Sequence, residues 1–555
     1  MFLKRIKQYS FADGILLASM LLVGGFQEYI SCALGAVMSI WLLCRIVRRK
    51  QLRIRWDLLT SAVVAICFGY GLTCLVGIDR GMALVGFLKF LPLLLYLFCL
   101  QQEETPGRAL EALPCFAAIM VIVSAVGMQF KPVESLFSVA GRLAGFFQYP
   151  NTFAVLLLVC ELWLLKKTGK KIVDYVVLLI LVAGFLYTGS RTAFLVAILA
   201  NVALLLTMTR KKVRIISLSA LGGVCVIGLL LALNPESVLH RYLNISLTES
   251  TFVGRLLYWV DALPLLLKYP FGMGYMGYYY IQQSIQTGVY SVAYIHNDFL
   301  QLALDAGLIP MGLFVAALVR WFLQKTVPTA DKIIVGAVCL HSFFDFDLQF
   351  VGMFFLLLLL LSLQTNDKVQ VVKPRLPLKL SFCAVVLVGL YLGTALMLAH
   401  LGNRELADKI YPYNTQNKLS ILEQAKDLET ANALAEEILA QNKQFYAPYS
   451  IKAKYCYSKG EFGAMITNQR AALERNPFDH REYETYCKML MIGIDLYKKA
   501  GDTASAEFCR TELIAVAQRL ASNGKRLSAL GKLIVDQPVL VLPQEIQTYI
   551  DGLGG

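Results

Sequence analysis

The sequence predicts an all-α protein, a polytopic bundle of membrane-spanning helices followed by a soluble helical domain. Hydrophobic residues make up 57% of the 555 residues and charged residues only 16%, whereas soluble globular domains carry about 25% charged residues. Apolar stretches of about 16–23 residues recur through residues 1–400, and that length crosses about 30 Å of hydrocarbon. Charged residues then recur throughout residues 401–555. The chain therefore divides into a membrane domain, 1–400, and a soluble domain, 401–555.

The membrane domain is predicted to contain about thirteen spans, because each apolar stretch has the length of one crossing. The expected limits are 11–26, 28–44, 58–77, 82–100, 109–128, 151–165, 172–188, 192–208, 213–233, 297–319, 333–345, 348–363 and 379–400. The first two spans are almost contiguous and would form a tight hairpin. The span 333–345 is short and has Asp345 at its end, with Asp347 just beyond it.

The loops between the spans give the orientation of this domain. Lysine and arginine gather in alternate loops, most densely at residues 45–55, 166–171 and 210–214. Loops rich in these residues stay in the cytoplasm, so we expect a cytoplasmic N-terminus. An odd number of spans then puts the C-terminal domain outside. The net charge of +14 reflects this topology and is no evidence for nucleic-acid binding. The first apolar run has no convincing cleavage site after it, so we interpret it as a retained span.

The largest predicted outer loop, residues 234–295, is rich in Tyr, Phe and Trp. Long loops inside compact proteins are usually functional. Apolar residues recur at helical spacing from Phe252 to Leu263, which predicts a helix at the outer membrane surface that carries Arg255 and Tyr258. The alternative is a plain interfacial cap.

The sequence indicates neither a dinucleotide-binding site nor a cysteine-based metal or disulfide framework. Gly272, Gly274 and Gly277 spell G-x-G-x-x-G, but no strand or βαβ unit surrounds them and the loop faces outside, which excludes a dinucleotide fingerprint. The 13 cysteines form no CxxC pair and no Cys/His metal spacing, so neither a metal site nor a disulfide framework is expected.

His296 is the first candidate for chemistry. It lies where the large outer loop meets the next span and is followed by Asn297 and Asp298. Histidine can take or give a proton near neutral pH, so His296 could deprotonate an acceptor hydroxyl at the membrane surface. The alternative is a histidine that only makes hydrogen bonds at the interface.

Three outer arginines, Arg142, Arg191 and Arg255, form the second candidate group. A guanidinium ion stays charged and binds phosphate oxygens in a bidentate manner, so several arginines that converge at one outer face would suit a diphosphate. Each could instead anchor an interface or pair with a nearby carboxylate. A third candidate is His341 with Asp345, four residues apart and therefore on one helix face. Such a pair could relay protons or hold the bundle together.

Five short motifs recur in a familiar order. They are Arg142-x-x-Gly145-Phe146 with Pro150-Asn151, Gly189-Ser190-Arg191-Thr192, Phe271-Gly272-x-Gly274, His296-Asn297 followed nine residues later by Gly307-Leu308-Ile309-Pro310, and the segment from His341 to Phe346. In this order they resemble the O-antigen ligase and O-antigen polymerase superfamily of bacterial membrane glycosyltransferases. The resemblance covers about residues 1–400, and the chain departs from it in its extra span and soluble tail.

The resemblance implies a GT-C-like fold and the transfer of a glycan from an undecaprenyl-diphosphate carrier to an acceptor hydroxyl outside the membrane. Carried over, His296 would be the base or the acceptor-orienting residue, and Arg142, Arg191 and Arg255 would grip the diphosphate. Asn297 and Tyr258, beside His296 and Arg255 in the sequence, are further candidates for substrate binding. The donor is already activated, so the resemblance implies no nucleotide, metal or other cofactor.

The tail carries a repeat signal. Asn442 and Asn476 are separated by the tetratricopeptide (TPR) period of about 34 residues, and Tyr449 and Pro477 fall at consensus-like positions. The alternative is an irregular helical bundle. Stacked helical hairpins offer concave protein-binding faces, so a TPR-like tail would bind an acceptor protein, a co-polymerase or the outer loop of the same chain.

These observations favour a lipid-linked glycan transferase, an O-antigen ligase or a polysaccharide polymerase, in the bacterial cytoplasmic membrane with its tail outside. Its partners would be the lipid-linked donor, a glycan, lipid or protein acceptor, and the bilayer. One alternative is an O-linked protein oligosaccharyltransferase of the same superfamily. Others are a small-solute transporter and a scaffold without catalysis. A transporter needs polar residues near mid-membrane, whereas here they concentrate in the outer loops.

Overall fold

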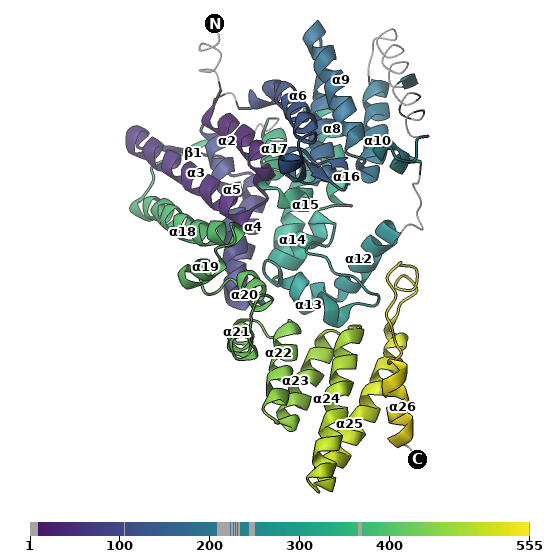
Figure 1. Ribbon diagram of the computed structural model, residues 1–555. Coiled ribbons are helices and arrows are strands. Elements are labelled where there is room, and N and C mark those ends of the chain that lie inside the picture. Colours follow the sequence, from purple (N-terminus) through teal and green to yellow (C-terminus); the bar gives the residue numbers. More distant parts are fainter. Residues whose placement is uncertain are drawn as a thin grey trace. The chain divides into compact units, whose positions relative to one another are not determined.

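The computed structural model describes residues 9–104, 106–207, 233–243, 250–363 and 369–553, with a few residues between 222 and 230. These residues form helices joined by short connections, with two small two-stranded sheets (Figure 1). They fall into two compact units. The first unit is Met1–Leu72, Leu84–Ser246 and Ile295–Met397, and the second is Thr73–Ala83, Leu247–Tyr294 and Leu398–Gly555.

The apolar helices confirm an all-α polytopic membrane protein. Among the described residues, five helices are long and apolar enough to cross a membrane: α3 (Glu28–Arg49), α4 (Leu58–Val76), α5 (Arg80–Gln101), α6 (Ala109–Gly127) and α18 (Leu376–His400). Shorter apolar helices are α2 (Phe11–Leu21), α9 (Ile172–Tyr187), α10 (Arg191–Thr207), α15 (Leu308–Leu323) and α17 (Val351–Ser362). The expected span 213–233 lies largely outside the described residues.

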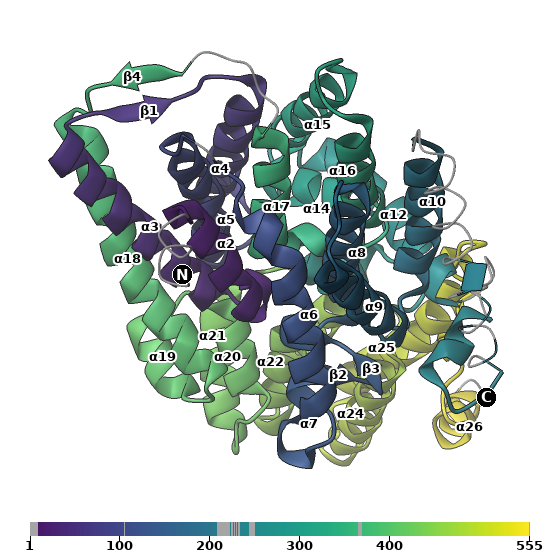
Figure 2. The same cartoon turned by 90° about the horizontal axis from the view of Figure 1, so that it is seen from above.

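Two helices form the centre of the first unit. In α8 (Pro150–Lys166) and α17 most side chains are buried on every face, as expected for helices surrounded by other helices. Helices α6, α9, α10 and α16 (Thr329–Ser342) pack around α8 (Figure 2). The start of α8 and the connection that leads into α17 therefore lie in the interior of this unit.

Three expected spans end at different places in the structure. The span 11–26 ends as a helix at Leu21, because Gly24 and Gly25 adopt positive φ angles and turn the chain toward α3. The span 297–319 is two helices, α14 (Asp298–Ala306) and α15, because Gly307 between them has φ = +103° and Pro310 has no N–H to continue the helix. The span 333–345 ends at Ser342, so Asp345 lies in the connection between α16 and α17.

Of the two short sheets, one joins segments that are distant in sequence and the other joins adjacent segments. Strand β1 (Leu52–Ile54) pairs antiparallel with β4 (Gln370–Val372), and β2 (Ser138–Val139) pairs with β3 (Arg142–Leu143). In the segment that contains β1, the backbone N–H groups of Arg53 and Arg55 donate to the side-chain oxygens of Gln102 and Gln101. Since hydrogen-bonded strands lie on one side of a membrane, the loops that contain β1 and β4 share a side.

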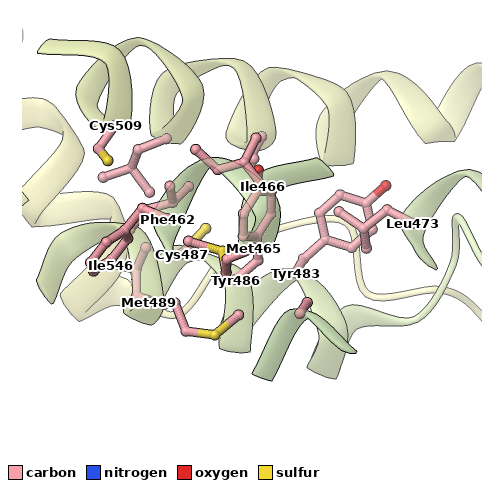
Figure 3. Packing of buried hydrophobic residues seen from close by; sticks show 14 of the residues in the cluster. Phe462, Met465, Ile466, Leu473, Tyr483, Tyr486, Cys487, Met489, Cys509 and Ile546 are labelled. Carbon is pink, nitrogen blue, oxygen red and sulfur yellow. The ribbon is translucent and has the colours of Figure 1, made fainter. Parts of the chain in front are cut away.

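The second unit combines the C-terminal tail with most of the large loop. The loop supplies α12 (Ser250–Lys268) and α13 (Gly277–Ile285). The tail supplies α19 (Arg404–Ile410), α20 (Thr415–Leu422), α21 (Leu428–Gln441), α22 (Ala447–Ser458), α23 (Phe462–Arg475), α24 (His480–Lys499), α25 (Thr503–Ser522) and α26 (Gln544–Leu553). Consecutive tail helices pack on each other. Phe462, Met465, Tyr486 and Cys487 are among the buried residues of the tail's core (Figure 3).

Hydrogen bonds connect the loop to the tail within this unit. The Ser528 hydroxyl lies 2.9 Å from that of Thr287, and Arg526 donates to the carbonyl oxygen of Ser284. Gln416 donates to the Tyr280 hydroxyl at 3.0 Å. Residues 250–294 and the tail are therefore folded together and must lie on the same side of the membrane.

Candidate functional site

His296 is held in an unusual backbone conformation at the start of α14. Its φ is +53°, a left-handed value that is uncommon for any residue except glycine. The backbone is fixed on both sides: Gln301 Oε1 accepts from Ile295 N at 3.0 Å, and the Asn297 side chain caps the helix by accepting from Leu300 N at 3.0 Å. Strain of this kind persists only where the surroundings enforce it, and it is common at functional sites.

The imidazole of His296 meets the buried carboxylate of Asp345. Nδ1 of His296 lies 3.2 Å from Oδ1 of Asp345, and the His296 side chain is 22% exposed while that of Asp345 is fully buried. Phe346 packs its ring edge-on against the imidazole, with 5.0 Å between centroids. A carboxylate that accepts from Nδ1–H leaves Nε2 as the basic nitrogen. Asp345 therefore holds the imidazole of His296 by its Nδ1 atom.

Residues at the start of α8 complete the surroundings of Asp345. The Tyr149 hydroxyl donates to Oδ1 at 2.8 Å, and Asn151 Nδ2 donates to Oδ2 at 2.7 Å. The Tyr149 ring also stacks on Phe346 at 4.6 Å. Each oxygen of the carboxylate thus has a donor, which fixes its plane relative to the imidazole.

Asn151 also connects this pair to Arg142. Nη2 of Arg142 donates to Asn151 Oδ1 and its Nε donates to the carbonyl oxygen of Thr188, both at 2.7 Å. Burial, together with the nearby charge of Arg241, lowers the pKa of Arg142 to about 10, so its guanidinium remains charged at neutral pH. A continuous set of hydrogen bonds therefore runs from a cation to His296.

Two arginines flank the turn at Gly189, and a third follows it. Gly189 has φ = +59°, and a Cβ atom there would lie 3.3 Å from Cδ of Arg241 and 3.5 Å from Nε of Arg142. Arg191 begins α10 two residues later. Like charges brought this close repel each other, and an anion bound between them would relieve that repulsion.

The predicted pairing of His341 with Asp345 is wrong. Nδ1 of His341 lies 2.6 Å from Oδ2 of Asp347, both side chains are fully buried, and Thr152 donates to the same carboxylate at 2.8 Å. The spacing of four residues does not apply because α16 ends at Ser342. Each aspartate of this connection therefore serves a different histidine.

The other predicted site residues have different positions. Asn297 is the N-cap of α14. Arg255 and Tyr258 lie on α12 in the second unit, where the Tyr258 ring packs on Tyr290 at 4.6 Å. Sequence reasoning missed Arg241, Tyr149 and the role of Asp345, although the motif with Pro150-Asn151 marked one part of this network. Among the described residues no His, Cys, Asp and Glu cluster could hold a metal ion.

The comparison with protein families adds an independent observation. Residues 176–315 match the model of the O-antigen ligase family, Wzy_C. The chain carries an O-antigen ligase domain. This domain begins within α9 and ends within α15, so it includes Arg191, Arg241 and His296, whereas Arg142 and Asp345 lie outside the matched residues. No curated protein matches the chain.

The O-antigen ligase domain sets the general activity. It indicates glycan transfer of the ligase or polymerase type in a bacterial membrane, from a lipid-linked donor to an acceptor. The apolar helices agree with that environment.

Proposed function

We propose that this protein transfers a glycan from an undecaprenyl-diphosphate-linked donor to an acceptor hydroxyl at the outer face of the bacterial cytoplasmic membrane. The observation that carries the proposal is the hydrogen-bonded connection from Arg142 through Asn151 and Asp345 to His296. It joins a general base to a cation in one preorganised unit.

The chemistry divides between the histidine and the arginines. Nε2 of His296 takes the proton of the acceptor hydroxyl while that oxygen forms a bond to the anomeric carbon of the donor sugar. The bond from the anomeric carbon to the diphosphate breaks, and its electron pair leaves with the diphosphate. Arg142, Arg191 and Arg241 stabilise the charge that develops there. Asp345 stabilises the imidazolium, which then releases its proton to water.

Chain connectivity supports a tail outside the cell. Helix α4 joins the basic loop that contains β1 to residues 77–79, and α18 joins β4 to the tail. If each crosses the membrane once, both lead from the side of the β1–β4 pair to the opposite side. The basic residues near β1 favour the cytoplasm, so the tail and the loop 247–294 would be outside. Arg255 and Tyr258 on this loop would then contact the donor or acceptor, and the helical tail, which we take to be TPR-like, would bind a protein partner.

A reconstituted transfer assay tests the proposal. The full-length protein in nanodiscs would receive a synthetic undecaprenyl-diphosphate oligosaccharide and, in separate reactions, a glycan, a glycolipid or a peptide acceptor. We expect transfer to one acceptor class, loss of transfer in His296→Ala, and full transfer in His480→Ala, a matched change of a histidine in the tail. Failure to consume the donor with any acceptor would contradict the proposal. Consumption with the peptide alone would make the protein an O-linked oligosaccharyltransferase.

A further inference from the structure

The second unit contains a polar cavity that the proposed transfer reaction does not use. It has a volume of about 590 Å³ and lies between the connection from α4 to α5 and the tail segment around α21. Its lining includes Arg80, Gly81, Tyr413, Gln441, Lys443 and Gln444. Small-molecule sites in proteins usually measure about 300–1,000 Å³, so the cavity has room for a ligand of a few sugar units.

The walls of the cavity are fixed by contacts between distant parts of the sequence. The Tyr411 hydroxyl donates to the carbonyl oxygen of Gly81 at 2.9 Å, and Asn442 Nδ2 donates to Asp79 Oδ2 at 3.2 Å. Met82 N donates to the other oxygen of Asp79 at 2.9 Å. A side chain at Gly81 would overlap the carbonyl oxygen of Tyr413. The cavity is therefore built by the docking of the tail on residues 77–81.

The lining offers positive charge and groups that bind sugar hydroxyls. Arg80 and Lys443 are both exposed, and no carboxylate pairs with either one in the part of the chain that the structure describes. The amide of Gln444 can donate to and accept from hydroxyl groups. The amide of Gln441 donates to the carbonyl oxygen of Pro412 and accepts from Thr415, which leaves it one N–H for a ligand. Tyr413 is 57% exposed, and its aromatic ring offers an apolar face for a sugar ring.

We propose that this cavity binds an acidic saccharide, meaning one that carries carboxylate or phosphate groups. Two cations without carboxylate partners favour an anion, and the amides and the ring favour a sugar over a simple ion. The choice of a saccharide as the ligand rests on the proposed function, because glycan transfer would bring saccharide chains to this unit. The site itself uses only residues of the second unit and none of the residues assigned to transfer. It would hold a distal part of an acceptor or of a growing chain.

Binding measured by calorimetry on the full-length protein tests this proposal without the transfer reaction. The protein would be placed in phosphatidylcholine nanodiscs and titrated with tri-galacturonate and with glucose 1-phosphate, and maltotriose would serve as the neutral control. We expect saturable binding of at least one acidic probe and about tenfold weaker binding of maltotriose, because each 1.4 kcal/mol of lost ion pairing is tenfold in Kd.

Variants assign the binding to the cavity. The double variant Arg80→Ala with Lys443→Ala should bind the acidic probe about tenfold more weakly, since two exposed ion pairs contribute about 1–2 kcal/mol together. Arg80→Lys with Lys443→Arg keeps the charges and should retain binding, which separates a charge effect from a folding defect. Lys498→Ala with Lys499→Ala removes two exposed cations at the end of α24 and should change nothing.

Three results would overturn the proposal. They are equal affinity in the Arg80/Lys443 alanine variant, equal binding of maltotriose, and loss of binding when phosphatidylglycerol replaces part of the lipid, which would make the cavity a lipid-headgroup site. His296→Ala should bind the acidic probe as the natural protein does. If the natural protein bound the acidic probe but transferred no glycan, only the proposed function would be rejected. If it transferred glycan but did not bind the probe, only this site would be rejected.

Discussion

Nδ1 of His296 lies 3.2 Å from Oδ1 of Asp345, although the two residues are 49 positions apart in the sequence. The aspartate is in the connection between α16 and α17, and the histidine precedes α14. In the proposed reaction this pairing lets Nδ1 donate to a buried carboxylate and leaves Nε2 to act as the base. The following predictions test that arrangement and the groups around it.

Substitution of His296 should separate proton transfer from acceptor positioning. His296→Ala should lower the rate of transfer by about 10²–10⁴, the usual range for loss of a general base, while binding of the lipid-linked donor is retained. His296→Gln keeps a hydrogen-bonding side chain but cannot take the proton, so it should be as slow. Near-normal transfer in the glutamine variant would show that His296 only orients the acceptor.

Asp345 and Asp347 should have different roles. Asp345→Asn can present an amide N–H to Nδ1 and favour the wrong tautomer, so turnover per folded molecule should fall about 10²-fold or more. Asp347→Asn disrupts the buried pair with His341, so it should lower the melting temperature most, with a cost of about 3–5 kcal/mol. Turnover and thermal unfolding of both purified variants would show whether this assignment is reversed.

The arginines around Gly189 should act on the donor. Arg142→Ala, Arg191→Ala and Arg241→Ala should each raise the KM for the lipid-linked donor, and lysine at the same position should restore only part of the effect, since it lacks the bidentate fork. The measurement is initial rate against donor concentration at a saturating acceptor concentration. Unchanged donor KM in all three alanine variants would remove the diphosphate role.

Gln301 should act as a positioning residue through the backbone of Ile295. Its side chain is buried, accepts from Ile295 N at 3.0 Å and donates to Asp305 at 2.8 Å. Gln301→Leu removes the acceptor, so the strained conformation of His296 relaxes and kcat should fall about tenfold or more. Gln301→Glu keeps the acceptor and should recover part of the rate.

A purely structural role for Gln301 would give a different pattern. It would lower the melting temperature of both variants and leave kcat per folded molecule unchanged. The comparison therefore needs kcat, KM and thermal unfolding for each variant.

Labelling of whole cells tests the side of the tail. A cysteine introduced at Ala504, an exposed residue of α25, should react with a membrane-impermeant maleimide in intact cells, because the tail is proposed to lie outside. A cysteine at Gln51, in the basic loop beside β1, should react only after lysis. The three native tail cysteines are buried and should contribute little signal. If the Ala504 cysteine also reacted only after lysis, the tail would be inside and the number of spans would be even.

Much of the general picture was available from the sequence, and its limits have identifiable causes. The apolar stretches predicted the membrane bundle, and the motif order predicted the O-antigen ligase domain. Span boundaries were less accurate where glycine intervened, because hydropathy does not register the positive φ of Gly24 or Gly307. The TPR-like character of the tail stays a prediction. The period of about 34 residues indicates helical hairpins but not how they stack.

The sequence alone determined the membrane class and singled out His296 and the outer arginines as candidates, because composition and short motifs depend only on neighbouring residues. Only the tertiary structure decided which aspartate serves which histidine, that Arg241 joins Arg142 beside Gly189, and that the loop 247–294 folds with the tail. These relations bring together side chains from separate helices. Spacing along one helix therefore cannot predict them, as the incorrect pairing of His341 with Asp345 demonstrates.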